Sequence, residues 1–157
     1  KKNLILRKVD FEDALEIFNL SNDDIVRKNS FNPRKIEWGN HLIWLKKKLK
    51  DENSIYFAVV DDLNRFYGQV SFDINIKNDE ARINISLGEK IRGLGLSSFI
   101  IDKSLDKLIK IKSIKLINAY IKDDNIPSIK SFKKSNFIFL KNQIIKGNKS
   151  KVYTKEV

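Results

Sequence analysis

Two neighbouring segments in which apolar and polar residues alternate constrain the fold of this chain most. Residues 65–77 read RFYGQVSFDINIK and residues 81–87 read ARINISL, so an apolar residue recurs at every second position. Strict alternation predicts strands that bury one face, and a short gap between two strands favours antiparallel pairing. These segments therefore predict the antiparallel middle of a sheet.

The flanking segments predict the rest of an α+β domain. Further strands are expected at 3–9, 54–60, 114–121, 137–145 and 150–156. Apolar residues at helical spacing predict four helices. The first follows Asp10, the second is marked by apolar residues between 36 and 49, the third runs from Leu94 to Ile111, and the fourth covers 126–135. Residues 21–35 are interpreted as a polar connection and 61–64 as a hairpin turn. Residues 1–157 are expected to form a single domain, with a mixed, largely antiparallel central sheet flanked by helices.

Composition excludes several kinds of site. The chain has no cysteine and one histidine, which excludes disulfides, a cysteine nucleophile and a multi-histidine metal site, so no metal is expected. Its apolar runs are far shorter than the roughly 20 residues that span a bilayer, and the N-terminal segment lacks a signal-peptide pattern. We expect a cytoplasmic protein without membrane contact.

The net charge of +11 favours a polyanionic partner, yet it has a simpler interpretation. The chain is rich in Lys, Ile and Asn together, and its lysines are scattered. Nucleic-acid modules interleave aromatic and basic residues or carry a groove-reading helix, and neither pattern is present. Nucleic acid is therefore disfavoured as a partner.

A glycine turn, KIRGLGLSSF at 90–99, lies between a predicted strand and a predicted helix. The first N–H groups of a helix are unpaired and carry partial positive charge, so a turn without side chains lets a diphosphate approach them. Gly93 and Gly95 permit that approach, and Arg92 adds charge. A dinucleotide-binding fold would place a third glycine at Ser98 and would need parallel strands before the turn.

The turn resembles the acetyl-CoA motif of the GNAT N-acetyltransferases, R/Q-x-x-G-x-G/A, and NIPSIKSFKKSNF at 125–137 resembles a second motif of that family. The resemblance implies that acetyl-CoA is the cofactor. It implies that main-chain groups at the end of the strand bind pantetheine, that Asn125 hydrogen-bonds the same arm and that Lys134 meets a phosphate. Asn125 also suits a helix N-cap. The implied cofactor residues are Ile85, Leu87, Arg92, Gly93, Leu94, Gly95, Leu96, Ser97, Asn125, Ser128 and Lys134.

The segment 25–49 is similar to a narrower group, the acetyltransferases of nucleotide-linked amino sugars in pseudaminic acid biosynthesis. This resemblance implies transfer to the 4-amino group of a UDP-linked deoxysugar, with Arg27, Ser30, His41 and Trp44 as substrate-binding residues. His41 and Trp44 are three apart and share a helix face. Both residues also suit the alternative roles of a surface or capping histidine and a core tryptophan.

Proton transfer is the least determined part of the predicted chemistry. Asp73 and Glu80 on polar strand faces are candidates to accept the amine proton, with Ser86 and Asn84 as less direct ones. Relatives often protonate the leaving sulfur with a tyrosine at the position of Phe132. Here Tyr120, Ser128 or Ser135 could serve instead, or the thiolate could leave unassisted, since a thiol pKa is near 8.5.

Other functions also fit the sequence. The acceptor could be a protein N-terminus, a polyamine or an antibiotic, although a polyamine favours an acidic pocket. A non-enzymatic module that binds nucleic acid or another anion is the remaining class, and it would lose affinity steeply with salt. Assembly into a homo-oligomer is compatible with all of these.

Overall fold

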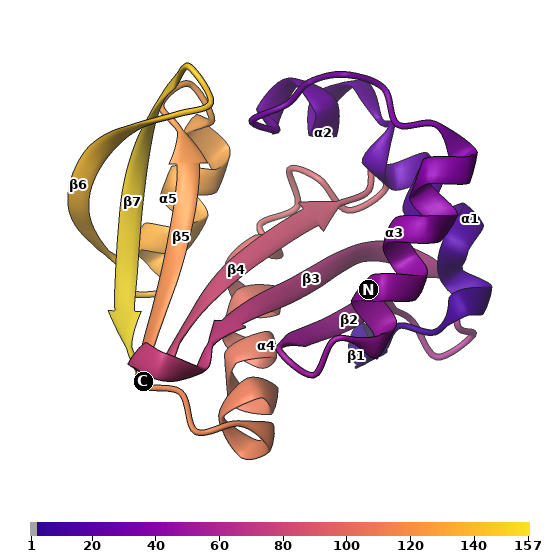
Figure 1. The fold of residues 1–157 in the computed structure, drawn as a ribbon, viewed down its shortest axis with the longest axis horizontal. Helices are drawn as coiled ribbons and strands as arrows, with labels where there is room; N and C mark the ends of the chain where they lie inside the picture. Colours follow the sequence, from indigo (N-terminus) through magenta and orange to yellow (C-terminus); the bar gives the residue numbers. More distant parts are fainter. Residues whose placement is uncertain (1–2) are drawn as a thin grey trace.

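The computed structural model describes residues 3–157, which form one seven-stranded sheet (Figure 1). The strand order is β1-β2-β3-β4-β5-β7-β6, and every neighbouring pair is antiparallel except β4 with β5. The strands are β1 (Ile5–Lys8), β2 (Ser54–Val60), β3 (Phe66–Asn75), β4 (Glu80–Leu87), β5 (Leu116–Lys122), β6 (Ile138–Ile145) and β7 (Asn148–Glu156). This confirms the predicted α+β class with a largely antiparallel sheet.

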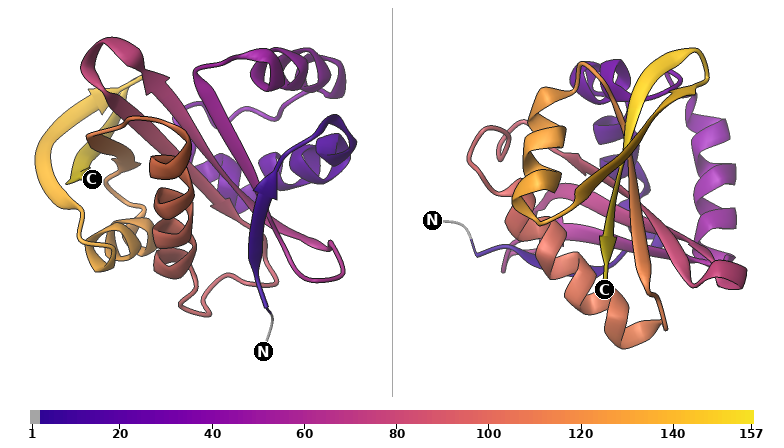
Figure 2. Two further views of the ribbon diagram at one scale, coloured as in Figure 1. Left: turned by 90° about the horizontal axis from the view of Figure 1, so that it is seen from below. Right: turned by 90° about the vertical axis from the view of Figure 1, so that its left-hand side faces the viewer.

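Helices cover both faces of the sheet, as Figure 2 shows. The five helices of the described residues are α1 (Ala14–Ser21), α2 (Asp24–Asn29), α3 (Trp38–Lys50), α4 (Ser97–Ile111) and α5 (Ile126–Lys134). Strand β2 contributes to both cores: Phe57 and Val59 pack with α4 and α5, whereas Tyr56, Ala58 and Val60 pack with α1 and α3. This is why its sequence, SIYFAVV, is apolar without alternation.

Strands β4 and β5 separate after a short parallel contact. Only Glu80–Arg82 pairs with Leu116–Asn118, and the two strands then diverge (Figure 1). The far edge of β4 remains paired with β3 throughout, with Gly68 opposite Leu87. A side chain at Gly68 would approach the Ser86 carbonyl oxygen to 2.7 Å, so glycine is needed for this close pairing. The divergence leaves main-chain groups on the β5-facing edge of β4 without a strand partner.

Several predicted boundaries are wrong for physical reasons. Helix α4 begins at Ser97 and not at Leu94, because Gly93 and Gly95 both have φ of +72°, which no right-handed helix contains. The predicted polar connection contains helix α2, which Asp23 caps by accepting hydrogen bonds from the Ile25 and Val26 N–H groups.

Two amphipathic faces also differ from expectation. Phe11 and Leu15 have the sequence spacing of one helix face, but both are exposed, and Phe11 precedes α1 in a turn of 3₁₀ helix. Ile76 extends the alternation of β3 in sequence, yet it begins a second 3₁₀ turn and is exposed. Within residues 3–157, no helix has the length and apolar character needed to cross a membrane.

Candidate active site

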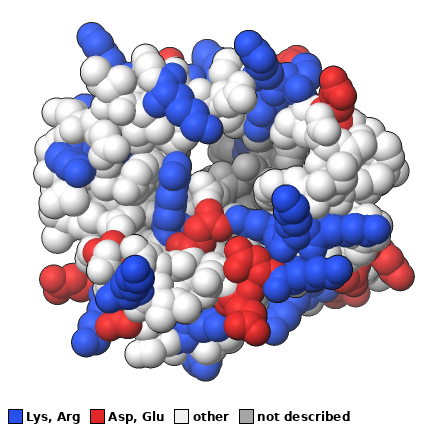
Figure 3. Space-filling model, in the orientation of Figure 1, with Lys and Arg blue, Asp and Glu red and all other residues white. Residues whose placement is uncertain are grey.

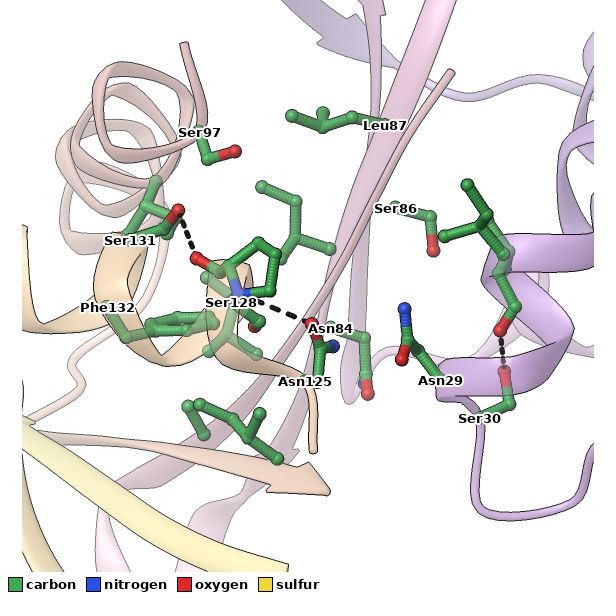
Figure 4. Close-up of a pocket in the computed structure, with 18 of the residues that line it drawn as sticks. Asn29, Ser30, Asn84, Ser86, Leu87, Ser97, Asn125, Ser128, Ser131 and Phe132 are labelled. Atoms are coloured by element: carbon green, nitrogen blue, oxygen red, sulfur yellow. Dashed lines mark hydrogen bonds between the residues drawn. The ribbon is translucent and has the colours of Figure 1, made fainter. Parts of the chain in front are cut away.

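A cleft of about 560 Å³ opens where β4 and β5 diverge. Figure 4 shows side chains of α4 and α5 on one side of the cleft, side chains of α2 on the other, and β4 between them. Ten of the site residues predicted from the sequence line it: Ser30, Ile85, Ser86, Leu87, Arg92, Gly93, Ser97, Tyr120, Asn125 and Ser128. The cleft therefore collects most of the predicted cofactor residues in one place.

The glycine turn at the end of this cleft fits a diphosphate. At Gly93 and Gly95 a Cβ atom would meet nothing within 4 Å, so the space beside the backbone is open. Helix α4 begins directly afterwards, and its N-cap residue Leu96 has no polar side-chain atom to pair with the first N–H groups. Free N–H groups and the positive end of a 15-residue helix thus face open space. The positive φ values explain why both positions are glycine.

Arg92 connects the glycine turn to α2. Its Nε donates to the Leu87 carbonyl oxygen at 2.9 Å, and its Nη2 donates to Asp23 Oδ1 at 2.7 Å. Burial by itself would raise the pKa of Asp23, but hydrogen bonds from Val26 and Arg92 outweigh it and lower that pKa below its ordinary value. The predicted phosphate ligand is therefore also the residue that holds α2 against the turn.

The second motif reaches the cleft through α5. The Asn125 side chain caps this helix, with its Oδ1 3.4 Å from the Ser128 N–H, and both residues line the cleft. Ser131 also lines it and donates to the Pro127 carbonyl oxygen at 2.9 Å. Lys134 is exposed and lies outside the cleft lining, so its side chain has no contact with this cavity in the structure.

The remaining residues of the turn differ in what they offer. The side chain of Leu94 is 62% exposed, and the cleft lining includes neither Leu94, Gly95 nor Leu96. These three residues can contribute main-chain groups to the turn, whereas Gly93 and Ser97 border the cleft itself.

A second cavity of about 570 Å³ lies on the other side of β4, against α3. Asn84 and Ser86 line both cavities, so they form the wall that the two share. The second cavity also contains three of the predicted residues that bear on the acceptor, Arg27, His41 and Trp44, and the predicted base Asp73. Ser30, in contrast, lines the first cleft.

Asp73 is held in place within the second cavity. Lys48 Nζ forms an ion pair with it, and Asn84 Nδ2 lies 3.5 Å from its other carboxylate oxygen. Nearby, the Tyr56 hydroxyl donates to Gln69, and burial raises the pKa of that phenol. Asp73 is thus a carboxylate beside the shared wall, and Tyr56 is a neutral hydrogen-bonding group.

His41 has a structural role in α3. It is almost fully buried, its Nε2 donates to the Ala14 carbonyl oxygen at 2.8 Å, and its ring stacks on Trp44 at a centroid separation of 5.9 Å. A carbonyl can only accept, so Nε2 carries the proton. Trp44 is 44% exposed and presents its ring to the cavity. Of the predicted pair, the tryptophan is the one with surface available to a ligand.

The guanidinium of Arg27 donates four hydrogen bonds within the chain. Nε donates to the Ser21 carbonyl oxygen, Nη1 to the carbonyl oxygens of Asn32 and Arg34, and Nη2 to Ser30 Oγ. Burial lowers the pKa of this guanidinium. Arg27 therefore fixes the loop after α2, and the predicted role in binding a diphosphate would require breaking those bonds.

Two further catalytic candidates lie in different surroundings. Glu80 starts β4, lies 3.4 Å from Asn118 Nδ2 and lines neither cavity, so it is too far along the strand to serve at the shared wall. Tyr120 lines the cleft, with the Arg82 guanidinium 4.3 Å from its ring centroid. Phe132 also lines the cleft and packs edge-on against Phe137, and Ser135 donates to the Ser98 carbonyl oxygen in the core.

The sequence alone did not point to several residues of the two cavities. Arg82, Lys48, Tyr56 and Gln69 line the second cavity, and Asn29, Phe31 and Ser131 line the first. The polar face of β4 was a usable signal for Arg82, because it alternates with the apolar face that contains Ile83 and Ile85. The residues on α2 had no such signal, since that segment was interpreted as a connection.

A mixed sheet that splays between a parallel strand pair, with a glycine turn before a helix at the open end, defines a coenzyme A-binding acyltransferase. Residues 3–138 match the model of the acetyltransferase (GNAT) domain family, and the chain belongs to that family. It is an N-acetyltransferase, and its cofactor is acetyl-CoA.

Solved structures support the same fold. Spermidine N-acetyltransferase from Vibrio cholerae, solved with CoA and spermine, matches with a TM-score of 0.88 at 20% identity, covering 98% of this chain and 95% of that one. A domain from Methanocaldococcus jannaschii matches with a TM-score of 0.84 at 21% identity, covering 100% of both chains. No curated protein matches the sequence. At these identities the matches show the fold of this chain and not its acceptor.

Proposed function

We propose that this chain transfers an acetyl group from acetyl-CoA to the 4-amino group of a nucleotide-linked deoxyamino sugar. The observation that carries this proposal is the charge of the second cavity. Arg27, Lys48 and Arg82 contribute three positive charges to its lining, and Asp73 contributes the one carboxylate. A concave surface with excess positive charge attracts an anionic acceptor and repels a polycation.

The surface of this face has the same character. Figure 3 shows a hollow near its middle, with Lys and Arg side chains on both sides and acidic side chains below it. Trp44 adds an exposed aromatic ring, which suits stacking on a base or a sugar. An aromatic ring beside cationic groups is the combination that a nucleotide requires.

The residues on the cofactor side of the shared wall are suited to bind acetyl-CoA and to orient it. The N–H groups of the turn and of the first residues of α4 would hold the diphosphate, and the unpaired edge of β4 would hydrogen-bond the pantetheine arm. Asn125 and Ser128 face the same cleft from α5. When bound, acetyl-CoA supplies a thioester whose carbonyl carbon is open to attack by an amine.

The residues on the acceptor side of the shared wall are suited to take a proton from the amine and to orient it. Asp73 lies next to Asn84, and its ion pair with Lys48 keeps the carboxylate in position to hold the proton that the ammonium group loses. Asn84 and Ser86, which border both cavities, would orient the amine toward the cofactor cleft. On the cofactor side the hydroxyls of Ser128 and Ser131 line the cleft, while Phe132 offers no proton.

A polyamine is the second candidate acceptor. Its support is the fold shared with spermidine N-acetyltransferases at about 20% identity. The lining of the second cavity, which is the proposed acceptor cavity, argues against a polyamine. A polyamine would meet three cationic side chains there and one carboxylate that is already paired with Lys48.

An acceptor assay tests the proposal. Release of CoA thiol would be followed with acetyl-CoA and one of four amines: a UDP-linked 4-amino sugar, the same sugar without nucleotide, spermidine, and a peptide with a free N-terminus. We expect the highest kcat/KM for the UDP-linked sugar, and a markedly lower value without the nucleotide. Equal or faster acetylation of spermidine would contradict the proposed acceptor.

A further inference from the structure

Of the three cations that line the acceptor cavity, Arg82 is the one whose charged group has no hydrogen-bond acceptor among residues 3–157. Arg27 donates to three carbonyl oxygens and one hydroxyl, and Lys48 is paired with Asp73. Within residues 3–157, no atom accepts a hydrogen bond from the Arg82 guanidinium, and no carboxylate forms an ion pair with it. Its Nε is buried without a partner.

A buried N–H without an acceptor is costly, so this arrangement needs an explanation. The guanidinium lies over the Tyr120 ring, 4.3 Å from the centroid, and 5.7 Å from the ring centroid of Phe31. The two aromatic rings fix the orientation of the planar Arg82 guanidinium, and the N–H groups at its edge remain available to a ligand. The group is therefore oriented in advance and has no partner within the protein.

The position of Arg82 on β4 suits an acceptor that spans the cavity. Arg82, Asn84 and Ser86 follow one another on the same face of the strand, about 7 Å apart from one to the next. An amine at the shared wall and an anionic group at Arg82 would thus be separated by about the width of one sugar ring and its ester oxygen.

We propose that Arg82 binds a phosphate group of the acceptor and is the specificity-determining residue of the acceptor cavity. This inference rests on the proposed function. A planar guanidinium donates two parallel hydrogen bonds to phosphate, and the charge penalises a polyamine placed in the same position. The reaction itself needs no contribution from Arg82.

The test measures UDP binding by calorimetry while CoA is saturating, so that the cofactor cleft is already filled. We expect Arg82→Gln to weaken UDP binding by about ten- to a hundredfold, with Arg82→Lys in between and the affinity for CoA unchanged. Arg34→Gln removes the same charge from an exposed position outside both cavities, and we expect no effect. Melting temperatures of all variants report whether each one folds.

The outcomes separate the two proposals. Equal UDP affinity in Arg82→Gln and the unchanged chain would overturn the assignment of Arg82, as would absence of UDP binding by the unchanged chain. UDP binding that depends on Arg82, together with no acetylation of any UDP-linked amino sugar, would overturn the proposed acceptor and leave the anion site standing. A loss of UDP affinity accompanied by a tenfold rise in KM for the UDP-linked sugar, at constant kcat, would support both.

Discussion

The two cavities that meet at β4 have nearly equal volumes, about 560 and 570 Å³, but are built from different parts of the chain. The cofactor cleft offers mainly main-chain groups, from the glycine turn, the start of α4 and the free edge of β4. The acceptor cavity is built from side chains, among them Arg82, Lys48 and Trp44. Under the proposed assignment, the fold fixes cofactor binding, while acceptor choice depends on a few side chains.

The largest effect should come from the main-chain site. In Gly95→Glu, a side chain at φ of +72° costs about 1–2 kcal/mol, and a carboxylate beside the helix N-terminus displaces the diphosphate. The strain lowers the free energy of unfolding, whereas the bulk and charge repulsion cost about 4 kcal/mol of binding, so we expect roughly a thousandfold loss of acetyl-CoA affinity by calorimetry, with UDP affinity unchanged.

Gly147→Glu is the matched control for this variant. Gly147 has φ of +78° with open space around it, and it lies outside both cavities. It should show the same backbone penalty in thermal unfolding without loss of acetyl-CoA binding. Equal loss of cofactor affinity in both glycine variants would contradict the assignment of the diphosphate site to the 93–95 turn.

The next largest effect should fall on the rate alone. Asp73→Asn keeps the shape of the side chain and removes the group that holds the amine proton, so kcat should fall about a hundredfold near pH 7. Because a more alkaline solution supplies the amine already neutral, the deficit should shrink as pH rises. A deficit that is constant across a steady-state pH profile would show that Asp73 only positions the acceptor.

A smaller effect should separate the two exposed tryptophans of α3. Trp44→Ala should raise the KM for the UDP-linked sugar about tenfold, because stacking on a base contributes about 1–3 kcal/mol. Trp38→Ala removes an equally exposed ring that does not line the cavity, and its KM should stay unchanged. Equal KM values in the two variants would contradict stacking of the acceptor on Trp44.

The smallest effect should involve both cavities, since α2 borders each of them. The pKa of Asp23 is lowered in the folded chain, so its pair with Arg92 stabilises the fold above the unfolded pKa near 3.9, and this contribution is lost as pH falls through the folded pKa. We expect Asp23→Asn to lower the free energy of unfolding by about 1 kcal/mol at pH 7, and this difference to shrink as pH falls below the unfolded pKa.

The neighbouring carboxylate provides the comparison for this measurement. Asp24 pairs with Lys35 at the exposed surface, where such pairs contribute little, so Asp24→Asn should change stability by a few tenths of a kcal/mol at most. Thermal unfolding across the pH range distinguishes the two variants. A difference between Asp23→Asn and the unchanged chain that stays constant as pH falls from 7 to 2 would contradict the role of the Arg92 pair.

The same contrast explains what the sequence could predict. Local backbone geometry selects glycine where φ is positive and a residue such as Asn125 where a helix needs an N-cap. A short sequence motif is therefore enough to predict both. Alternation likewise predicted β3 and β4, because one face of each is buried.

The acceptor cavity was less predictable, because hydrogen-bond partners far apart in the sequence decide what each side chain does. Arg27 and His41 suit ligand binding by type, yet both are used within the chain: the folded loop after α2 brings carbonyl oxygens to Arg27, and the carbonyl oxygen of Ala14, 27 residues away in sequence, accepts from His41. Arg82 is free because no acceptor lies near it, which only the assembled sheet reveals. Helix α2 was missed because its apolar residues face a cleft and not a core.

A crystal structure of the chain with CoA and a UDP-linked 4-amino sugar bound together tests the central claim most directly. We expect the diphosphate of CoA to contact the N–H groups of the 93–97 turn and the sugar to lie against α3 on the other side of β4. The thiol and the 4-amino group would then meet at Asn84 and Ser86. A sugar nucleotide that occupies the cofactor cleft in competition with CoA, or binds at a surface away from this wall, would contradict it.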